Sequence, residues 1–479
     1  MNEARLLRSA AQALIAAAII VACSPPHWAV GDIIDDWNNI TIQVIRNDTS
    51  QPGPTFGSRN MAMVHAAMFD AINSISETHT PYRLDLPAPP GASREAAGIQ
   101  AAYRVLVGLY PAQAAFLVAE RNAKLAAIPN GTAKSDGIDI GETVALDMLA
   151  WRSTDGANTF VPYTPGVLPG MWRPDPVNPG QQALGPGWGL VTPFAVDDVV
   201  ALRGPAPPAL NSPAYTAAFN EVKMVGSVDA EMLGNRTPEQ TEIGIFWGYD
   251  RGGLGPPPVL YNQITQQVVD QLAQPLSLEE HARLFALVNL AQADAGIACW
   301  DTKYLFNFWR PVTAIRAAAT DGNMLTMADP NWVPLGAPDS TPFSPPGFTP
   351  PFPAYGSGHA TIGAAFFQVL ADYYGGDNFS FTLESDELPG VTRDFTSFSQ
   401  AAEENGQSRI YLGIHWSFDK TAGIAMGNQI GDYVFQNYLQ PTIVPEPSTM
   451  MLLAIGGMIG AGVYWRKQRR QNCRLGIRE

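Results

Sequence analysis

Three short stretches in the second half of this 479-residue chain carry side chains that could together bind a tetrahedral oxyanion. They supply three cations, a turn that contains glycine, and two histidines. Cations and backbone N–H groups are the donors that proteins use to bind phosphate, and vanadate has the same shape and charge. The sequence therefore predicts a phosphate or vanadate site. The stretches are Lys303-x6-Arg310-Pro311, Ser357-Gly358-His359 and Ser408-Arg409-x5-His415-x3-Asp419.

The first stretch places two cations seven residues apart in an apolar segment. At about 100° per residue, Lys303 and Arg310 return to nearly the same face of a helix. We expect that helix to span 278–308 and to end before Pro311, because proline disrupts a helix interior. Taken alone, the pair could equally be the solvated face of a surface helix.

The second stretch opens a strongly apolar segment that we expect to be a helix over 358–374. Backbone N–H groups at a helix start form an anion site, and Gly358 allows close approach. The Ser357 hydroxyl can donate a further hydrogen bond, and His359 lies on the first turn, within reach of the anion. Taken alone, this motif could also be a simple turn.

In the third stretch, Arg409 and His415 bracket a short connection before a helix expected over 416–439. Asp419 lies one turn further on, where it could orient the imidazole of His415 or fix its tautomer. A lone histidine is more often a packing or capping residue. That interpretation applies to the other histidines of the body: His65, His79 and His281.

Helical periodicity dominates the remainder, and no run of alternating residues predicts a strand. We expect an all-α fold with two four-helix-bundle-like halves, 30–200 and 201–440, joined by long loops rich in Pro and Gly. The most plausible seam is 161–213. Expected helices, the first capped by Ser58, are 58–75, 94–109, 111–127, 136–151, 212–223, 237–249, 259–273, 278–308, 358–374 and 416–439.

Composition limits the classes of function. The net charge is −15, and both ends are basic, so the body between them is more acidic still. An acidic body argues against a nucleic-acid partner. Of the three cysteines, Cys23 and Cys473 fall in the terminal segments and only Cys299 in the body. The body therefore has neither an internal disulfide nor a cysteine-based metal site.

Both ends have the composition of targeting segments. Arg5 and Arg8 precede an apolar run over 10–22, which predicts a secretory signal peptide over 1–29. The residues before Cys23 also loosely match a lipoprotein cleavage box. At the C-terminus, within 441–479, Val444-Pro445-Glu446-Pro447 precedes an apolar run over 450–465 and a basic cluster over 466–470. This could be a membrane anchor. It also resembles the PEP-CTERM sorting signal of exopolysaccharide-producing Gram-negative bacteria. That resemblance implies handling by a sorting machinery and export to the periplasm, cell surface or medium.

The joint occurrence of the three stretches resembles the signature shared by vanadium-dependent haloperoxidases and by type-2 phosphatidic acid phosphatases and bacterial acid phosphatases. The flanking residues look like the vanadium chloroperoxidase type, closely over 237–440 and loosely over 30–236. Gly356 departs from the family, which usually has proline there, so we expect a less preorganised turn. The flanking matches are Phe246 to Asp250, Pro256-Pro257, Tyr261-Asn262-Gln263, Trp300-x-x-Lys303 and Pro351 to Tyr355.

The resemblance implies a role for each site residue. His415 would bind vanadium, and His359 would act as general acid–base on peroxide. Lys303 would also polarise the bound peroxide, and Asp419 would support His415. Hydrogen peroxide and halide would be the substrates and hypohalous acid the product. The vanadate oxygens would contact Lys303, Arg310, Ser357, Gly358 and Arg409, and the halide-side pocket would contain Trp300 and Phe352.

Two other hypotheses remain open on the sequence. An acid phosphatase would use the same residues, with His415 as the nucleophile and His359 protonating the leaving group. Phosphate would then compete with vanadate for the site even in a haloperoxidase. A non-enzymatic surface protein with a relic site would fit the two ends, but such a site should have lost some of its cations or histidines.

Overall fold

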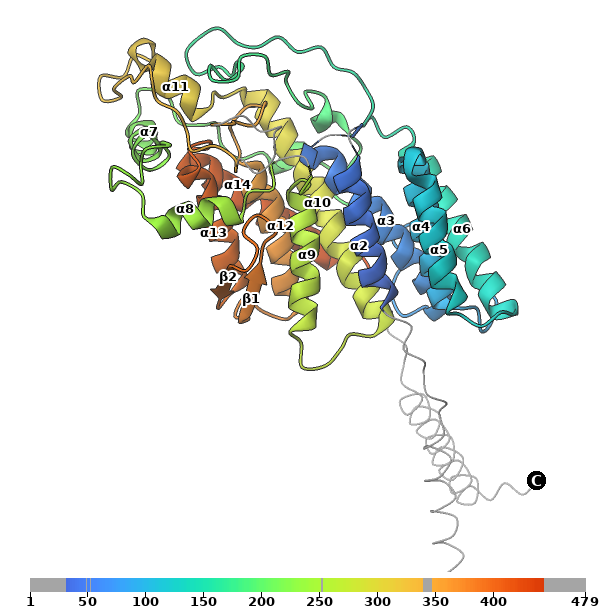
Figure 1. Ribbon diagram of the computed structural model, residues 1–479. Coiled ribbons are helices and arrows are strands. Elements are labelled where there is room, and N and C mark those ends of the chain that lie inside the picture. The colour runs from blue at the N-terminus through green and yellow to red at the C-terminus, as the bar shows by residue number, and fades with distance from the viewer. Residues whose placement is uncertain (1–31, 49, 52, 251–252, 339–346, 443–479) are drawn as a thin grey trace, which may run out of the picture.

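The computed structural model describes residues 32–48, 50–51, 53–250, 253–338 and 347–442. The predicted signal peptide over 1–29 lies outside these residues, as does the predicted sorting segment over 441–479 from residue 443 onward. The described chain is built from helices, which confirms the all-α prediction (Figure 1).

The N-terminal helices form one side of the molecule. In Figure 1, α2 and α3 lie beside α10, and α4, α5 and α6 form the far edge. Helix α4 packs between α3 and α6. The bounds are α2 (Ile33–Asn47), α3 (Gly53–Ser76), α4 (Arg94–Leu109), η1 (Pro111–Gln113), α5 (Ala114–Ala126) and α6 (Thr132–Arg152), followed by the short turns η2 (Trp188–Leu190) and η3 (Val199–Leu202).

The C-terminal helices form the other side, around α12 (Figure 1). One antiparallel hairpin lies beside them, with Phe381 opposite Phe395, so the expectation of no strands was wrong at this point. The bounds are α7 (Pro213–Val225), α8 (Pro238–Phe246), α9 (Pro257–Asp270), α10 (Leu278–Phe306), α11 (Pro311–Ala317), η4 (Ala318–Thr320), α12 (Gly358–Tyr373), β1 (Phe381–Glu384), β2 (Thr392–Phe395), α13 (Phe398–Tyr411) and α14 (Ser417–Asn437).

Helix α10 is the central element of the fold. It packs against α3 on one side and α12 on the other, and most of its length is buried. Its buried residues fall on every face, so neighbouring elements surround it. Ser277 caps its start by accepting a hydrogen bond from the Glu280 N–H, and Asn307, in the left-handed conformation (φ 49°), ends it. In its last turn Lys303 is buried, whereas Leu305 is 51% exposed.

Helices α12 and α14 pack unusually closely because glycine recurs every fourth residue on α14. A Cβ at Gly427 would come within 2.3 Å of the Thr361 carbonyl oxygen. The close packing brings the starts of the two helices together, and the Ser357 N–H donates to the Asp419 carbonyl oxygen at 3.1 Å. The second and third sequence stretches thus meet.

The long segment between α6 and α7 runs back across α10. The carboxylate of Asp294, in the middle of α10, accepts hydrogen bonds from three consecutive backbone N–H groups, those of Phe194, Ala195 and Val196. The predicted domain boundary at 200/201 stays a prediction.

Several local predictions need correction. Ser58 does not cap a helix, because α3 already begins at Gly53 and the Ser58 hydroxyl donates to the Thr55 carbonyl. Helices α2, α11 and α13 were not predicted. Within the described residues, no single helix has the length and hydropathy to cross a membrane, although α4 together with the segment Pro111–Ala126 passes that test as a pair bent by 119°.

Candidate functional site

The three stretches meet where α10, α12, α13 and α14 have their ends. Lys303 lies in the last turn of α10, and Arg409 in the last turn of α13. Arg310 is not on the same helix as Lys303, so that prediction was wrong. It immediately precedes α11, whose first residue is Pro311, which therefore begins a helix rather than ending one. The two cations still converge, because the chain turns back at Asn307.

The Lys303 ammonium is fully buried and donates to three backbone carbonyl oxygens. Its Nζ lies 3.0 Å from the Pro353 oxygen and 3.1 Å from that of Ala354, and it bonds closely to the Gly356 oxygen. Burial lowers the pKa of Lys303 to about 8. The Gly356 turn, which departs from the family pattern, thus supplies one of the acceptors that position Lys303.

The two arginines have buried donors without partners. Arg310 Nε donates to the Phe352 oxygen at 2.9 Å, but its Nη2 has no hydrogen-bond acceptor. Arg409 Nη2 bonds to Asp250, while its Nε and Nη1 have no acceptor. A buried donor left unpaired costs about 1–3 kcal/mol, so three of them together indicate a site that awaits an anion.

The imidazole of His415 is held between a donor and an acceptor. Its Nε2 lies 2.9 Å from Arg310 Nη1, and its Nδ1 lies 2.8 Å from Asp419 Oδ2. A guanidinium can only donate, so His415 Nε2 carries the lone pair and Nδ1 carries the proton. Burial, together with the nearby positive charge of Arg310, lowers the pKa of His415 well below its usual value. The expected contact between Asp419 and His415 is therefore present.

His359 lies on the first turn of α12, as expected, and is buried. Its Nε2 lies 2.7 Å from the Gly248 carbonyl oxygen, so that nitrogen donates and Nδ1 carries the lone pair. Burial and the charge of Arg409 lower the pKa of His359 to about 4. The ring is therefore neutral near pH 7 and able to accept a proton.

Trp300 and Phe352 lie together beside the cations. Their ring centroids are 4.8 Å apart, and Lys303 Nζ lies 5.0 Å from the centroid of Phe352. Gly358 is close to the same wall, since a Cβ there would meet the Trp300 ring at 3.6 Å. Ser357 is buried, and its hydroxyl accepts from the Ala360 N–H as the cap of α12.

The predicted residues surround a small cavity of about 20 Å³. Its walls include six of them: Trp300, Phe352, Gly358, His359, Arg409 and His415. Of the other four, Arg310 and Asp419 bond to His415, and Lys303 lies over the Phe352 ring. The fourth, Ser357, donates its N–H to the Asp419 carbonyl oxygen. A wider cavity of about 370 Å³ has walls in common with the small one, at Pro54, Asp250, Pro257, Pro350 and Phe352. It therefore forms a vestibule to the site.

The sequence did not identify Asp250 as a site residue, although it lies within one of the flanking matches. Its carboxylate pairs with Arg409 and is mostly buried. Tyr261 and Asn405 were also missed as supports, and both donate to the His359 carbonyl oxygen. The three histidines that we interpreted as structural make packing or pairing contacts. His65 stacks on Phe285, His79 pairs with Glu280, and His281 pairs with Asp32.

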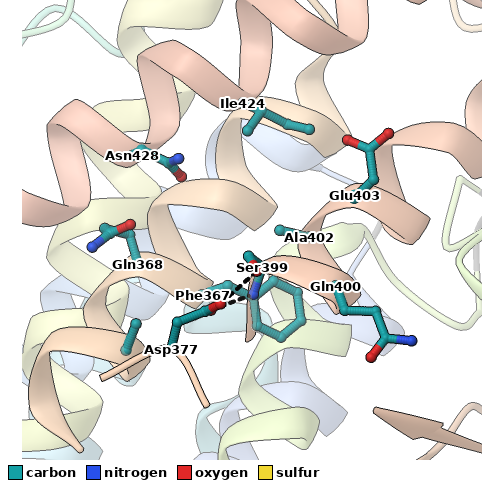
Figure 2. A pocket seen from close by; sticks show the side chains of 10 residues that line it. Phe367, Gln368, Asp377, Ser399, Gln400, Ala402, Glu403, Ile424 and Asn428 are labelled. Atoms are coloured by element: carbon teal, nitrogen blue, oxygen red, sulfur yellow. Dashed lines mark hydrogen bonds between the residues drawn. The ribbon is translucent and has the colours of Figure 1, made fainter. Parts of the chain in front are cut away.

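A separate groove of about 410 Å³ runs between α12, α13 and α14 (Figure 2). Asp377 points into it but already accepts two hydrogen bonds from Ser399. Its walls have carboxyl and amide groups, such as those of Glu403 and Asn428, but neither histidine nor a cation. The groove therefore lacks the chemistry of the site.

The donors fit a tetrahedral oxyanion better than a metal cation. Three unpaired guanidinium nitrogens, the start of α12 and the lone pair of His415 Nε2 converge there. Lys303, Arg310 and Arg409 carry three positive charges, against the carboxylates Asp250 and Asp419. Vanadate combines anionic oxygens with a metal centre that accepts a nitrogen ligand, so these residues fit it.

Comparisons with known proteins agree with this geometry. The model of the VCPO second helical-bundle domain matches residues 283–442, and that of the PEP-CTERM protein-sorting motif matches residues 444–470. The vanadium chloroperoxidase of Curvularia inaequalis is 31% identical over 490 residues, which cover 81% of this chain and 78% of that protein.

Solved structures show the same fold. A bacterial vanadium-dependent iodoperoxidase superposes with a TM-score of 0.72 at 24% identity, covering 86% of this chain and 97% of the other. A holo bacterial vanadium-dependent chloroperoxidase gives 0.62 at 18% identity, covering 83% and 97%. The fold, the site and the length of the match to the Curvularia protein together show that this chain belongs to the vanadium haloperoxidase family.

Proposed function

We propose that this chain is an exported enzyme that uses vanadate to oxidise halide with hydrogen peroxide, giving hypohalous acid. One observation carries the proposal. Three buried guanidinium nitrogens without acceptors, on Arg310 and Arg409, lie at a site where the Nε2 lone pair of a neutral His415 is also present.

In this proposal Arg310, Arg409 and the start of α12 at Ser357 and Gly358 would hold the vanadate oxygens, and His415 Nε2 would be the ligand of the metal. When bound, vanadate supplies a Lewis acid that activates peroxide toward halide without changing its own oxidation state. To serve as that ligand, His415 Nε2 would give up the hydrogen bond that it accepts from Arg310 Nη1. Asp419 holds the Nδ1 proton and so keeps the lone pair on Nε2.

His359 is the general acid–base of this proposal. Its Nε2–H donates to Gly248, so Nδ1 is the atom that accepts a proton from hydrogen peroxide. With a pKa near 4 in the absence of a bound anion, the ring is neutral and ready to accept. A bound anion would raise this pKa, because a negative charge stabilises the imidazolium, and the ring could then return the proton to the product.

Lys303 contributes close positive charge. All three of its donors already bond to carbonyl oxygens. A direct contact with vanadate or peroxide, as the family resemblance implies, requires one of these bonds to be replaced. The ring faces of Trp300 and Phe352 lie beside Lys303 and provide an apolar wall where a weakly hydrated halide could approach.

The acid phosphatase hypothesis uses the same donors, but the relatives found are vanadium peroxidases, so it is not favoured. Its chemistry still predicts competition, because phosphate has the shape and charge that the arginines accept. We propose that phosphate binds this site and displaces vanadate.

The sorting motif over 444–470 indicates export in a Gram-negative bacterium. We propose that the mature protein is delivered through sorting machinery to the cell surface or the medium. There, hypohalous acid would form away from the cytoplasm.

The decisive experiment compares vanadate-free and vanadate-loaded full-length protein. Chloride, bromide and iodide oxidation by peroxide are measured beside hydrolysis of an aryl phosphate. The proposal predicts halide oxidation only after loading, and its inhibition by phosphate. Vanadate-independent hydrolysis without halide oxidation would instead establish the phosphatase.

A further inference from the structure

Exposed methionines occur on α7, on the turn that follows α7 and on the loop that follows η4. Four methionines there are between 51% and 96% exposed, with Met324 the most exposed. Thioether side chains are apolar and are usually buried, so four exposed ones in these segments are unusual. They are Met224, Met232, Met324 and Met327, and we call them the methionine corner.

Hydrogen bonds hold this corner together. Lys223 Nζ, beside Met224 at the end of α7, donates to the Met327 carbonyl oxygen at 2.8 Å. Asn323 Nδ2, beside Met324, donates to Thr216 Oγ1 on α7 at 2.8 Å. Figure 1 shows α7 and α11 side by side at this corner. The loop that carries two of the methionines is therefore fixed against the helix that carries a third.

Most of the other cysteine, tryptophan and methionine side chains of the described chain are buried. Cys299 is buried, and so is every described tryptophan except Trp151. Trp151 is half-buried, with the Arg83 guanidinium 4.5 Å from its ring centroid. Among the described methionines, only Met171 is partly covered, and five are buried: Met61, Met63, Met68, Met148 and Met426.

Beneath the corner lies the aromatic core that supports the site. Tyr215 and Phe219 of α7 pack on Trp416, which follows His415 directly. Trp332 also belongs to this core, and its Nε1 donates to the Lys223 oxygen at 3.0 Å. Oxidation of these tryptophans would disturb the support of His415, whereas oxidation of an exposed methionine leaves the core unchanged.

We propose that the methionine corner is a sacrificial oxidation site for the enzyme's own product; this rests on the proposed halide oxidation. The thioether sulfur attacks the halogen of hypohalous acid and releases hydroxide. Water then adds to the sulfur, and halide leaves with both bonding electrons. In the net change, one thioether and one hypohalous acid give one sulfoxide, one halide ion and one proton. Sulfur loses two electrons and halogen gains two. The sulfoxide is polar but exposed, so the fold tolerates it.

The first experiment follows the vanadate-loaded full chain during turnover with bromide and peroxide. Peptide mapping at intervals should find sulfoxide at Met224, Met232, Met324 and Met327 before activity falls and before any buried methionine is oxidised. Peroxide without bromide is the control and should oxidise them far more slowly. Activity that falls while these four remain intact would overturn the proposal. The proposal would also be overturned if a second copy of this chain covered the methionine corner and kept it from the oxidant.

The second experiment needs no turnover and so separates this proposal from the function on which it rests. Reagent hypobromite is titrated into vanadate-free protein, and tryptophan fluorescence and the peptides of Trp332 and Trp416 are followed. Replacing the four methionines by leucine should advance the onset of tryptophan oxidation by about four equivalents, one for each sulfur.

A matched control changes the same surface without removing sulfur: Leu233→Ile together with Leu325→Ile. It should oxidise as the wild type does. An unchanged onset in the four-methionine variant would overturn the proposal even if halide oxidation is established. An advanced onset with no enzymatic halide oxidation would leave the corner's chemistry intact and overturn the proposed function instead.

Discussion

His415 Nδ1 lies 2.8 Å from Asp419 Oδ2, and both side chains are buried. The contact fixes the imidazole in the tautomer whose Nε2 carries the lone pair, which accepts from Arg310 Nη1. The same carboxylate oxygen also accepts a hydrogen bond from the N–H of Trp416, the residue that precedes α14. One carboxylate thus both caps the start of α14 and orients the imidazole of His415.

Replacing Asp419 by asparagine should weaken vanadate binding. The amide does not fix the imidazole tautomer, and loss of a carboxylate partner of a metal-binding histidine typically costs about 10–100-fold in affinity. Vanadate titration followed by protein fluorescence measures the change. Asp372→Asn, outside the site on α12, is the matched control and should bind as the wild type does. Equal affinity in both variants would show that Asp419 does not orient His415.

Replacing either arginine by lysine should weaken vanadate binding while the positive charge remains. Arg310→Lys removes the unpaired Nη2, and Arg409→Lys removes the unpaired Nε and Nη1. Loss of a hydrogen bond to a charged group costs about 1.5–3 kcal/mol, or roughly 10–100-fold in affinity. Equilibrium dialysis measures the dissociation constant. Arg46→Lys, at the vestibule, should change it little; if charge alone mattered, all three variants would bind equally.

His359→Ala should separate catalysis from binding. General acid–base groups contribute about 10²–10⁴-fold to rate, so kcat for bromide oxidation should fall by that order while vanadate still binds. The matched control is His65→Gln, a buried histidine outside the site, which should retain kcat. If His359→Ala kept a near-normal kcat, His359 would not be the group that transfers the proton.

The titration of His359 provides a test by pH. Because its folded pKa is about 4, below the usual 6.5, the unfolded chain binds more protons between these values. Its contribution to the free energy of unfolding is thus fully present above pH 6.5 and is lost as the pH falls through about 4. NMR of the imidazole in vanadate-free protein should place its titration near pH 4, and vanadate should raise it. A titration at its ordinary value would contradict the burial of the ring.

Close packing of α12 on α14 should be sensitive to a single methyl group. Gly427→Ala places a Cβ against the Thr361 oxygen, and such overpacking costs about 1–3 kcal/mol. We expect a lower melting temperature and weaker vanadate binding, because the starts of the two helices separate. Gly180→Ala, where no atom lies within 4 Å of the added Cβ, should change neither. An unchanged melting temperature for Gly427→Ala would mean that the two helices can separate without cost.

The sequence predicted the site better than it predicted the elements around it. The types and spacing of Lys303, Arg310, Arg409 and His415 predicted an oxyanion pocket, because such a set of side chains is unusual in an apolar setting. The role of His415 as the metal ligand came from the family resemblance and stays a prediction. The prediction that Lys303 and Arg310 lie on one helix was wrong, because the left-handed conformation of Asn307 ends α10 before Arg310. Helical periodicity does not predict at which residue the backbone becomes left-handed and ends the helix.

Asp250 was missed for a different reason. It lies after α8 in a loop rich in glycine and proline, and its contact with Arg409 spans 159 positions of sequence. A local sequence pattern does not predict a contact between residues so far apart in the chain. Helix α13 was missed because its exposed face is polar and amide-rich, so its hydrophobic periodicity is weak. Local patterns identified the reactive groups, while tertiary contacts decided which of them are paired.

The most direct test of vanadate-dependent halide oxidation is to titrate vanadate-free protein with orthovanadate while bromide oxidation by peroxide is measured. We predict no activity at the start, a rise in proportion to added vanadate, and saturation at a single equivalent per chain. We also predict that His415→Ala stays inactive throughout. Full activity without vanadate, or equal activity in His415→Ala, would contradict the assignment of His415 as the vanadium ligand of a vanadate-dependent enzyme.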